Sequence, residues 1–430
     1  MKSLTTGRRR FLYSAVSALA ASRSSHGAND KISLAFIGTG VMGSENLSAA
    51  MDQGGIAVAA VCDVYQPNLE RAAAIARRGG HQPKEVKDFR QVLADKSIDA
   101  VCISTPDHWH PYISVEACKA GKDVYVEKPA GVWLGEGRKM VEAARKYNRI
   151  VQAGTWQRSG THFKQACDFV RRGDLGTIAF CRTWIYNNAP RTGIGNPADS
   201  TPPPGLDWEL WQGPARHRTF NPNRFGVYPN AYSYFRYFWD YAGGTLTDSG
   251  VHMIDILQMA FGEAMPKSFA AVGGKYWFTD DTETPDTLQV SLSYPGFLGS
   301  WEHRSNNTEA TKSRLMGVSF HGNRGTLYVD RAGYQLTPEN GSDLQPAKSG
   351  RIDDGHPLHW ANFLECVRSR KRPTSDIETC QRSSATCILG NLSYRLGLKL
   401  DWDEKAQTTV QTEARQYLEP AYEPPWELKV

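Results

Sequence analysis

Residues 32–43 read ISLAFIGTGVMG: a short apolar run, then three glycines spaced as GxGxxG at the start of a helix-like stretch. A strand before the glycines and a helix after them form the context in which this pattern binds a dinucleotide. The first glycine allows a tight turn, the second lets pyrophosphate approach the backbone, and the third lets helix and strand pack closely. The amides at the helix start then face the phosphates. We expect the dinucleotide to lie along Gly38, Thr39, Gly40, Val41, Met42 and Gly43.

Asp63 follows the second apolar run, twenty residues beyond Gly43. A carboxylate at the end of the second strand can accept hydrogen bonds from the adenosine ribose hydroxyls, and it repels a 2′-phosphate. This position therefore predicts NAD as the cofactor and disfavours NADP. An ordinary turn residue at the end of a strand is the alternative interpretation of Asp63.

Short β-branched runs alternate with amphipathic stretches from residue 31 to residue 155. The expected strands are 32–37, 57–61, 100–104, 124–126 and 150–153. The helices expected between them include 67–78, 109–120 and 134–147. Repeated alternation of strand and helix implies right-handed crossovers and a parallel sheet with helices on both faces. Residues 31–155 are thus predicted to be an NAD-binding Rossmann domain.

The pattern changes after residue 155 and predicts a second domain over 156–430, for substrate binding and oligomerisation. The expected helices are 161–172, 359–369 and 378–396. Alternating segments predict strands at 177–186, 268–278, 287–294, 298–304 and 318–329. Strands this close together favour an open, largely antiparallel sheet. The sequence therefore predicts an α/β fold with an N-terminal Rossmann doubly wound parallel sheet and a C-terminal α/β domain built on that second sheet.

A long stretch at 187–230 interrupts the second domain. It is rich in Pro, Gly, Asn and Trp and contains PPPG at 202–205. Loops longer than about 12–15 residues are uncommon in compact domains and usually act as lids, binding loops or subunit contacts. The stretch is therefore predicted to be a lid or a subunit arm.

The formal charge of +5 lies almost entirely in the first thirty residues, which hold five basic side chains and one acidic one. The rest of the chain has 45 basic and 44 acidic residues. Binding to nucleic acid or anionic lipid needs a clustered basic face, which this balance does not indicate. The eight cysteines form no CxxC pair, so they are expected to be buried thiols rather than metal ligands.

Residues 1–30 resemble a twin-arginine signal, with Arg8, Arg9 and Arg10 followed by the short apolar run 12–21. That run is too short for a stable membrane span, and no later stretch approaches the ~18 apolar residues that one needs. The segment predicts export to the periplasm of a protein folded around its cofactor. A disordered basic tail is the alternative interpretation.

The fourth and fifth predicted strands run into TPDHWH at 105–110 and into EKPAG at 127–131. Ligands of doubly wound sheets bind outside the carboxyl ends of the strands, so both loops should border the dinucleotide. Proline after Lys128 restricts the lysine backbone to an extended form and would hold its amine where nicotinamide lies. The spacing of the aspartate and histidines supports a metal site poorly, so no metal is predicted. The predicted cofactor contacts here are Thr105, Pro106, His108, His110, Glu127 and Lys128.

Asp248, His252 and Asp255 share one face if residues 245–255 form a helix. Oxidation of an alcohol carbon removes the hydroxyl proton as hydride leaves, and histidine titrates nearest neutral pH. An aspartate one turn earlier could orient the imidazole or bind a neighbouring hydroxyl. Taken alone, a helix-start aspartate and a core histidine explain these residues at least as well.

The four motifs in this order, GxGxxG, TPDHWH, EKPAG and GGxLxDxGxHxxD, resemble the Gfo/Idh/MocA family of oxidoreductases over about residues 31–400. The resemblance implies a catalytic lysine at Lys128, with Asp248 and His252 in the other two catalytic positions. It also implies a mixed-sheet substrate domain whose open face forms a homodimer or homotetramer.

These residues predict an NAD-dependent enzyme that transfers hydride between nicotinamide and a hydroxyl carbon of a sugar or polyol. Lys128 and His252 would share the hydroxyl proton. Two alternatives are a redox-neutral enzyme that cleaves glycosides by transient oxidation, and a non-catalytic sugar sensor loaded with dinucleotide. The candidate substrate contacts are Trp156, Gln157, Arg158, Arg236, Tyr237 and Asp255.

Overall fold

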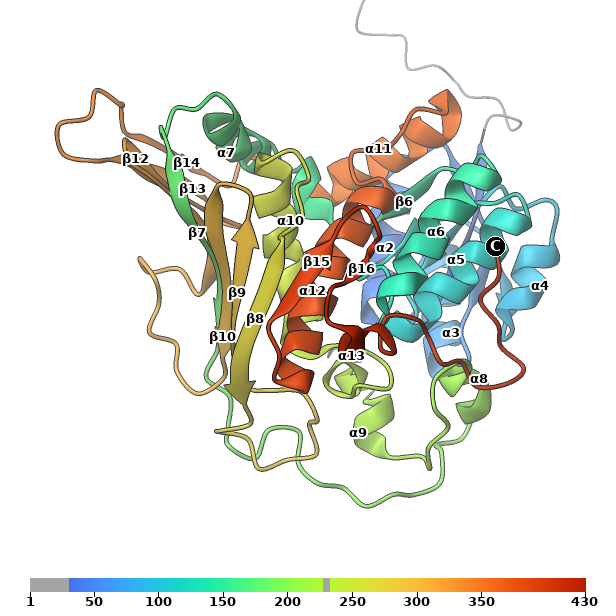
Figure 1. Cartoon of the computed structure of the whole chain (residues 1–430). Coiled ribbons are helices and arrows are strands. Elements are labelled where there is room, and N and C mark those ends of the chain that lie inside the picture. The colour runs from blue at the N-terminus through green and yellow to red at the C-terminus, as the bar shows by residue number, and fades with distance from the viewer. Residues whose placement is uncertain (1–30, 227–232) are drawn as a thin grey trace, which may run out of the picture.

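A computed structural model describes residues 31–226 and 233–430, which form two sheets with helices packed between and around them (Figure 1). The signal segment predicted at 1–30 and the last residues of the predicted lid lie outside the described residues. Within the described ranges, no helix has both the length and the apolar character needed to cross a membrane.

The first sheet has six parallel strands in the order β3-β2-β1-β4-β5-β6, which confirms the predicted doubly wound Rossmann sheet. Only β3 was not predicted, because it is a three-residue edge strand with two exposed side chains and no apolar run. The strands are β1 Ile32–Ile37, β2 Ile56–Cys62, β3 Lys84–Val86, β4 Ala100–Ile103, β5 Asp123–Val126 and β6 Val151–Ala153.

Alternate side chains of these strands feed separate apolar cores on the two faces of the sheet. One core packs against α4, α5 and α6, and the other packs against α2 and α3. The second core also contains Trp360 of α11 (Gly355–Ser369), whose ring stacks on Tyr125 at 4.3 Å. The other helices are α2 Val41–Gln53, α3 Gln66–Arg78, α4 Phe89–Ala94, α5 His110–Lys119 and α6 Leu134–Lys146.

The second sheet has ten strands in the order β14-β13-β12-β11-β7-β10-β9-β8-β15-β16. Its described strand pairs are antiparallel apart from β7 with β10, which confirms the predicted open, largely antiparallel sheet. The strands are β7 Ile178–Tyr186, β8 Ser268–Gly274, β9 Thr287–Tyr294, β10 Phe297–Arg304, β11 Met316–Gly322, β12 Gly325–Asp330, β13 Gly333–Pro338, β14 Ala347–Gly350, β15 Leu400–Asp403 and β16 Thr408–Thr409.

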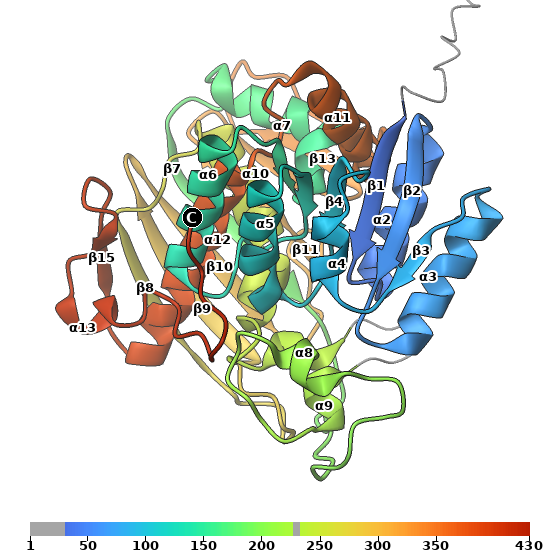
Figure 2. The ribbon, with the colours of Figure 1, turned by 90° about the vertical axis from the view of Figure 1, so that its right-hand side faces the viewer.

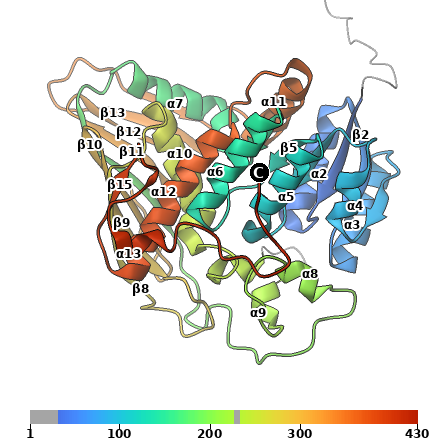
Figure 3. The same ribbon diagram turned by 45° about the vertical axis from the view of Figure 1, so that its right-hand side comes forward.

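Helices cover one face of this second sheet, as the burial of β9 shows: its Leu, Val and Leu side chains are buried while the alternating Gln and Ser side chains are exposed. The covering helices are α7 (Thr161–Arg171), α10 (Val251–Ala260) and α12 (Ile377–Leu396). Every residue of α10 is buried. Figure 3 shows α10 and α12 between the two sheets, and α12 also contacts α6. This arrangement places the start of α10 near the carboxyl edge of the Rossmann sheet.

The predicted lid is a folded segment, and its Trp208, Trp211 and Phe225 share an aromatic core with residues that follow it, such as Phe238. It contains α8 (Trp208–Gln212) and α9 (Pro222–Phe225), and the 3₁₀ turn η4 (Tyr234–Tyr237) follows it along the chain. Figure 2 shows α8 and α9 below the Rossmann half of the molecule. The remaining short helix is α13, Thr412–Arg415.

Candidate functional site

A cavity of about 720 Å³ runs along the carboxyl edge of the Rossmann sheet to the first turn of α10. Its walls include Gly38 and Asp63 at one end and Lys128, Asp248 and His252 at the other. The fold therefore brings the predicted dinucleotide loop and the three predicted catalytic side chains to one cavity.

The glycine turn between β1 and α2 fits a bound pyrophosphate. Gly38 has φ +79° and a Cβ there would lie 2.6 Å from the amide nitrogen of Thr105. A Cβ on Gly43 would overlap the carbonyl oxygen of Gly38, so the helix packs directly on the turn. Gly40 lines the cavity, and a Cβ built on it meets no atom within 4 Å. The missing side chain at Gly40 thus leaves open space where a phosphate can approach the backbone.

Asp63 at the end of β2 is tied to the same turn. Its Oδ2 accepts hydrogen bonds from the amide (2.7 Å) and hydroxyl (3.2 Å) of Thr39, and its Oδ1 accepts from the amide of Tyr65 at 2.9 Å. Burial raises the pKa of Asp63, and these hydrogen bonds oppose that shift. Thr39 itself is fully buried beneath the turn. The carboxylate therefore holds the turn in shape and lines the end of the cavity where an adenosine ribose would lie.

The side chains of the TPDHWH loop point in two directions. Thr105, Pro106 and His110 line the cavity, and the His110 ring lies 2.9 Å from the carbonyl oxygens of Thr105 and Pro129. Burial lowers the pKa of His110 to about 4, so the ring is neutral. His108 does not line the cavity, because it packs into the aromatic core of the lid, 3.1 Å from the carbonyl oxygen of Trp211. His108 was predicted as a cofactor contact, but in the structure it supports the site from outside the cavity.

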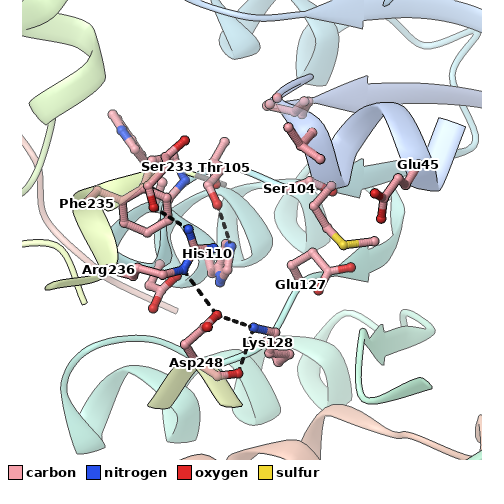
Figure 4. A pocket seen from close by; sticks show the side chains of 18 of the residues that line it. Glu45, Ser104, Thr105, His110, Glu127, Lys128, Ser233, Phe235, Arg236 and Asp248 are labelled. Atoms are coloured by element: carbon pink, nitrogen blue, oxygen red, sulfur yellow. Dashed lines mark hydrogen bonds and ion pairs between the residues drawn. The ribbon is translucent and has the colours of Figure 1, made fainter. Parts of the chain in front are cut away.

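Lys128 and Asp248 form a close ion pair at the other end of the cavity (Figure 4). The Lys128 ammonium donates to the side-chain Oδ1 and to the backbone carbonyl oxygen of Asp248, both at 2.9 Å. Arg236 of η4 approaches the same carboxylate at 3.3 Å. Burial raises the pKa of Asp248, but the charges of Lys128 and Arg236 outweigh it and hold that pKa well below its usual range. Asp248 is therefore ionised, and it fixes both cations.

His252 lies in the first turn of α10, directly after the π-helical turn η5 (Leu246–Gly250) that carries Asp248. It is 6% exposed and lines the cavity. Its Nδ1 has no hydrogen-bond partner within the described part of the chain. Burial and the nearby charges of Lys128 and Arg331 lower the pKa of His252 well below its ordinary value. The imidazole is therefore neutral at physiological pH, and one of its ring nitrogens is free of a proton.

Two models of one protein family match this chain. The model described as the oxidoreductase family NAD-binding Rossmann fold matches residues 32–155, and that of the family's C-terminal alpha/beta domain matches residues 183–270. The chain belongs to the Gfo/Idh/MocA family of oxidoreductases. The chain thus has an NAD-binding Rossmann domain, and the glycine turn and Asp63 lie within it.

Several named dehydrogenases are similar to this chain. A trans-1,2-dihydrobenzene-1,2-diol dehydrogenase from Oryctolagus cuniculus is 26% identical over 354 residues, which cover 80% of this chain and 92% of that enzyme. An inositol 2-dehydrogenase from Salmonella typhimurium is 29% identical over 153 residues, covering 35% of this chain and 45% of that enzyme. The solved WlbA dehydrogenase from Bordetella pertussis, in complex with NADH and UDP-GlcNAcA, has a TM-score of 0.64 and 20% identity over 87% of this chain and 99% of that one.

The predicted substrate contacts fall into two groups, one inside the cavity and one outside it. Trp156, Arg236 and Tyr237 line the cavity. Arg158 and Asp255 lie outside it and form a buried ion pair at 2.6 Å. A buried charge needs an opposite charge close by. This ion pair therefore links the turn η3 (Trp156–Ser159) to α10.

Gln157 also lies outside the cavity and acts through its neighbours. In the orientation that satisfies its amide, it accepts from Arg331 Nε at 2.9 Å and donates to the His252 carbonyl oxygen at 3.3 Å. The Arg331 guanidinium lies over the Trp156 ring, 4.9 Å from its centre. Gln157 therefore positions cavity residues and does not itself face the cavity.

Several cavity residues of the oxidoreductase were not predicted as site residues. Asp107 lines the cavity and is 7% exposed, and burial raises its pKa to about 7. Its place in the TPDHWH motif was a signal that could have found it. Arg331 lies in the short turn between β12 and β13, where no motif marks it. Among the described residues, no group of three or more His, Cys, Asp or Glu side chains could hold a metal ion.

The start of α11 adds a further cavity wall through Asp354 and His356. The His356 Nε2 lies 2.9 Å from Asn46 Oδ1 on α2, and the Asn46 amide donates to Glu127 Oε1 at 2.9 Å. Burial raises the pKa of Glu127, which was predicted as a cofactor contact and lines the cavity beside Lys128. A helix from the far end of the chain thus shares a hydrogen-bond network with the Rossmann half.

Proposed function

We propose that this oxidoreductase transfers hydride between NAD and a hydroxyl-bearing carbon of a sugar or polyol. The observation that carries the proposal is the meeting of Lys128, Asp248 and His252 in the cavity that also contains the NAD-binding turn. Bound NAD supplies the hydride chemistry, and the protein supplies position and proton handling.

The three side chains divide the proton chemistry between them. The Lys128 ammonium, held by Asp248, can donate a hydrogen bond to the substrate oxygen and stabilise the negative charge that develops as its proton leaves. The neutral imidazole of His252 can accept a hydrogen bond from the substrate hydroxyl and take part in the transfer of its proton. Asp248 stays ionised through this step and keeps the lysine oriented.

The substrate class follows from the cavity and from the relatives. The substrate end combines the aromatic ring of Trp156 with polar groups such as Arg236, Tyr237 and His356. An aromatic ring beside several hydrogen-bonding side chains suits a ring compound with several hydroxyls. The two related enzymes are named for a cyclic diol and a cyclic polyol, and the solved WlbA dehydrogenase holds a nucleotide sugar. These names support a cyclic polyol or sugar as substrate.

The test is a substrate screen with the NAD-loaded protein against monosaccharides, disaccharides and polyols, followed by absorbance at 340 nm and by product mass. The expected result is a product two mass units lighter than one of the substrates, together with reduced cofactor. Cleavage of a disaccharide without net oxidation would instead show the redox-neutral glycoside-cleaving enzyme. Saturable sugar binding without any product would show the sugar sensor.

We also propose export through the twin-arginine route and assembly into a homodimer or homotetramer. The export proposal rests on Arg8, Arg9 and Arg10. The assembly proposal rests on the sheet face that the helices leave uncovered, where Val272 is 70% and Leu298 46% exposed. Replacement of all three arginines by lysine should keep the protein in the cytoplasm, and light scattering on the purified protein gives the oligomeric state. Cytoplasmic retention of the wild type, or a monomer, would contradict these proposals.

A further inference from the structure

A second, smaller cavity lies next to the cavity that contains Lys128, which we call the main cavity. Its volume is about 150 Å³, and it lies at the edge of the second sheet where β7, β8 and β10 end and β9 begins. A single water needs only ~10–15 Å³, so this space can hold a group of several heavy atoms. We call it the side cavity, and its lining includes Asn187, Tyr237, Thr245, Phe278, Thr284 and Ser305.

Tyr237 connects the two cavities, because it lines both of them. Its carbonyl oxygen accepts hydrogen bonds from the amides of Glu283 and Thr284 at 3.0 and 3.3 Å, which attach the loop between β8 and β9 to η4. Thr245 lines the side cavity, and Asp248, three residues later, lines the main cavity. The side cavity is therefore next to the place where the substrate hydroxyl would react.

The floor of the side cavity contains a buried hydroxyl that the protein leaves unsatisfied. Thr284 is 2% exposed, and its Oγ1 has no hydrogen-bond partner among the described residues. A Cβ on Gly244 would lie 2.7 Å from Thr284 Oγ1, so the turn before η5 packs directly on this threonine and holds it in place. A buried hydroxyl without a hydrogen bond costs free energy. A hydroxyl-bearing ligand in the side cavity would supply the missing bond.

Two carboxylates of the side cavity indicate the charge of its ligand. Asp286 Oδ2 accepts hydrogen bonds from the amides of Trp277 and Phe278, both at 2.8 Å. Asp280 forms an ion pair with Lys275 at 3.1 Å. These contacts offset the negative charges and fix the carboxylates, and carboxylate oxygens have several lone pairs that can accept further hydrogen bonds. The side cavity therefore suits a neutral ligand with hydroxyl donors better than a cation.

The remaining lining combines aromatic and polar surface. Phe278 and Tyr237 supply aromatic surface, whereas Thr245 and Ser305 supply hydroxyls. Asn187 is exposed and Ser305 is 7% exposed, so the side cavity runs from the surface of the molecule to a buried floor. A sugar ring has an apolar C–H face and a rim of hydroxyls, and it can use both kinds of surface.

We propose that the side cavity binds a second sugar ring of the substrate, so that the enzyme acts on a disaccharide or a longer glycoside. One ring places its hydroxyl carbon in the main cavity, the glycosidic link passes Tyr237, and the next ring lies against Phe278 and Thr284. This inference rests on the proposed function and names the substrate class within it. The alcohol carbon loses a hydride to NAD and its hydroxyl loses a proton, and the glycosidic bond stays intact.

The first experiment compares disaccharides with the sugars that compose them. The wild type with excess NAD is given maltose, cellobiose, lactose or trehalose, and in parallel D-glucose or D-galactose, and absorbance at 340 nm is followed. For at least one disaccharide, kcat/KM should exceed the values of its component sugars about tenfold, because the second ring adds hydrogen bonds and an aromatic contact. Equal values for every disaccharide and its components would overturn the inference.

Substitutions in the side cavity then test its residues through the ratio of the two kcat/KM values. Thr284→Val removes the unsatisfied hydroxyl and keeps the shape of the side chain, so the variant should fold, and the ratio should fall about 3–10-fold. Ser305→Leu fills the side cavity and should abolish the preference. Thr326→Val is the matched control, because Thr326 of β12 is half-buried and lines neither cavity, and it should keep the wild-type ratio. A preference that survives Ser305→Leu would overturn the inference.

The second experiment measures binding and needs no turnover. The NAD-loaded protein is titrated calorimetrically with the same disaccharides and with D-glucose. One disaccharide site per chain that weakens about tenfold or more in Ser305→Leu would support the side cavity even if no alcohol is oxidised, and that result would disprove only the proposed function. Two glucose sites per chain, of which Ser305→Leu removes one, without any preference for a disaccharide, would show a separate sugar site and overturn the inference.

Discussion

The two ends of the cavity are built in different ways. At the adenosine end, the glycine turn and Asp63 lie within 26 residues of each other and are joined by hydrogen bonds to backbone amides. At the chemical end, Lys128 and Asp248 are 120 residues apart and are joined by opposite charges. Local backbone geometry therefore shapes the binding end, whereas packing of the two halves assembles the catalytic end. Substitutions at the two ends should separate cofactor binding from catalysis.

The largest effect is expected from Lys128→Ala, which removes the cation of the chemical end and leaves the adenosine end intact. The value of kcat should fall about 10³-fold, within the range of a lost proton-handling group, while NAD content stays unchanged. Steady-state rates and NAD per chain measure the two quantities. Lys84→Ala, at a side chain 72% exposed, is the control and should change neither. A normal rate for Lys128→Ala would disprove its catalytic role.

The next effect concerns the pH dependence of stability and the buried carboxyl of Asp107. Burial is the main cause of its folded pKa of about 7. The charges of Lys128 and Arg236 lower this pKa, and the charge of Asp248 raises it. Because the pKa of an unfolded aspartate is ~3.9, stability is lost as pH rises from about 4 through 7, by up to about 4 kcal/mol. Asp107→Asn should therefore unfold at higher denaturant concentration than the wild type at pH 8, and at a similar one at pH 4.5. An equal difference at both pH values would contradict the raised pKa.

A smaller effect is expected from Asp63→Asn at the adenosine end. Loss of a charged hydrogen-bond acceptor should weaken NAD binding roughly 10–100-fold, which corresponds to about 1.5–3 kcal/mol. The variant should also discriminate less against NADP, because the repulsion of a 2′-phosphate is removed. Fluorescence titration gives both Kd values, and kcat at saturating NAD should stay within about twofold. A fall in kcat with unchanged NAD affinity would place Asp63 in the chemical end instead.

The smallest effect is expected from His356→Ala, which tests the link between α11 and α2. The variant loses the contact of the imidazole with Asn46 Oδ1, but that oxygen keeps its hydrogen bond from the Trp360 indole at 3.0 Å. The free energy of unfolding should therefore fall by only about 0.5–1 kcal/mol. Urea denaturation measures this change. A loss above about 3 kcal/mol would mean that His356 supports more of the interface than this one contact.

Sequence patterns predicted most of the longer strands, but they merged β11 and β12 into one strand at 318–329 and missed β13, β15 and the short edge strands. The strand β1 and its glycine turn were predicted because they are an unbroken apolar run and a contiguous motif. The edge strands β14 and β16 carry little apolar pattern, since most of their side chains are exposed or half-buried. Burial on one face produces the alternation that predicts a strand, and edge strands lack it.

The candidate site residues were also predicted only in part. Lys128, Asp248 and His252 were placed by their motifs, and the structure brings all three to one cavity. Arg158 and Asp255 were predicted as substrate contacts, and the structure buries them as an ion pair outside the cavity. The direction of a side chain at the end of an element depends on its neighbours in space, which a linear motif does not contain.

The sequence by itself determined the Rossmann sheet, the NAD-binding turn and the identity of the chemical groups, because each depends on residues close together in the chain. Only the tertiary structure decided which charges meet Lys128, that α11 packs on the Rossmann sheet, and that residues 205–225 wall the adenosine end. Those contacts join residues many positions apart. Their formation depends on how complementary surfaces pack, and no local pattern of residues encodes that packing.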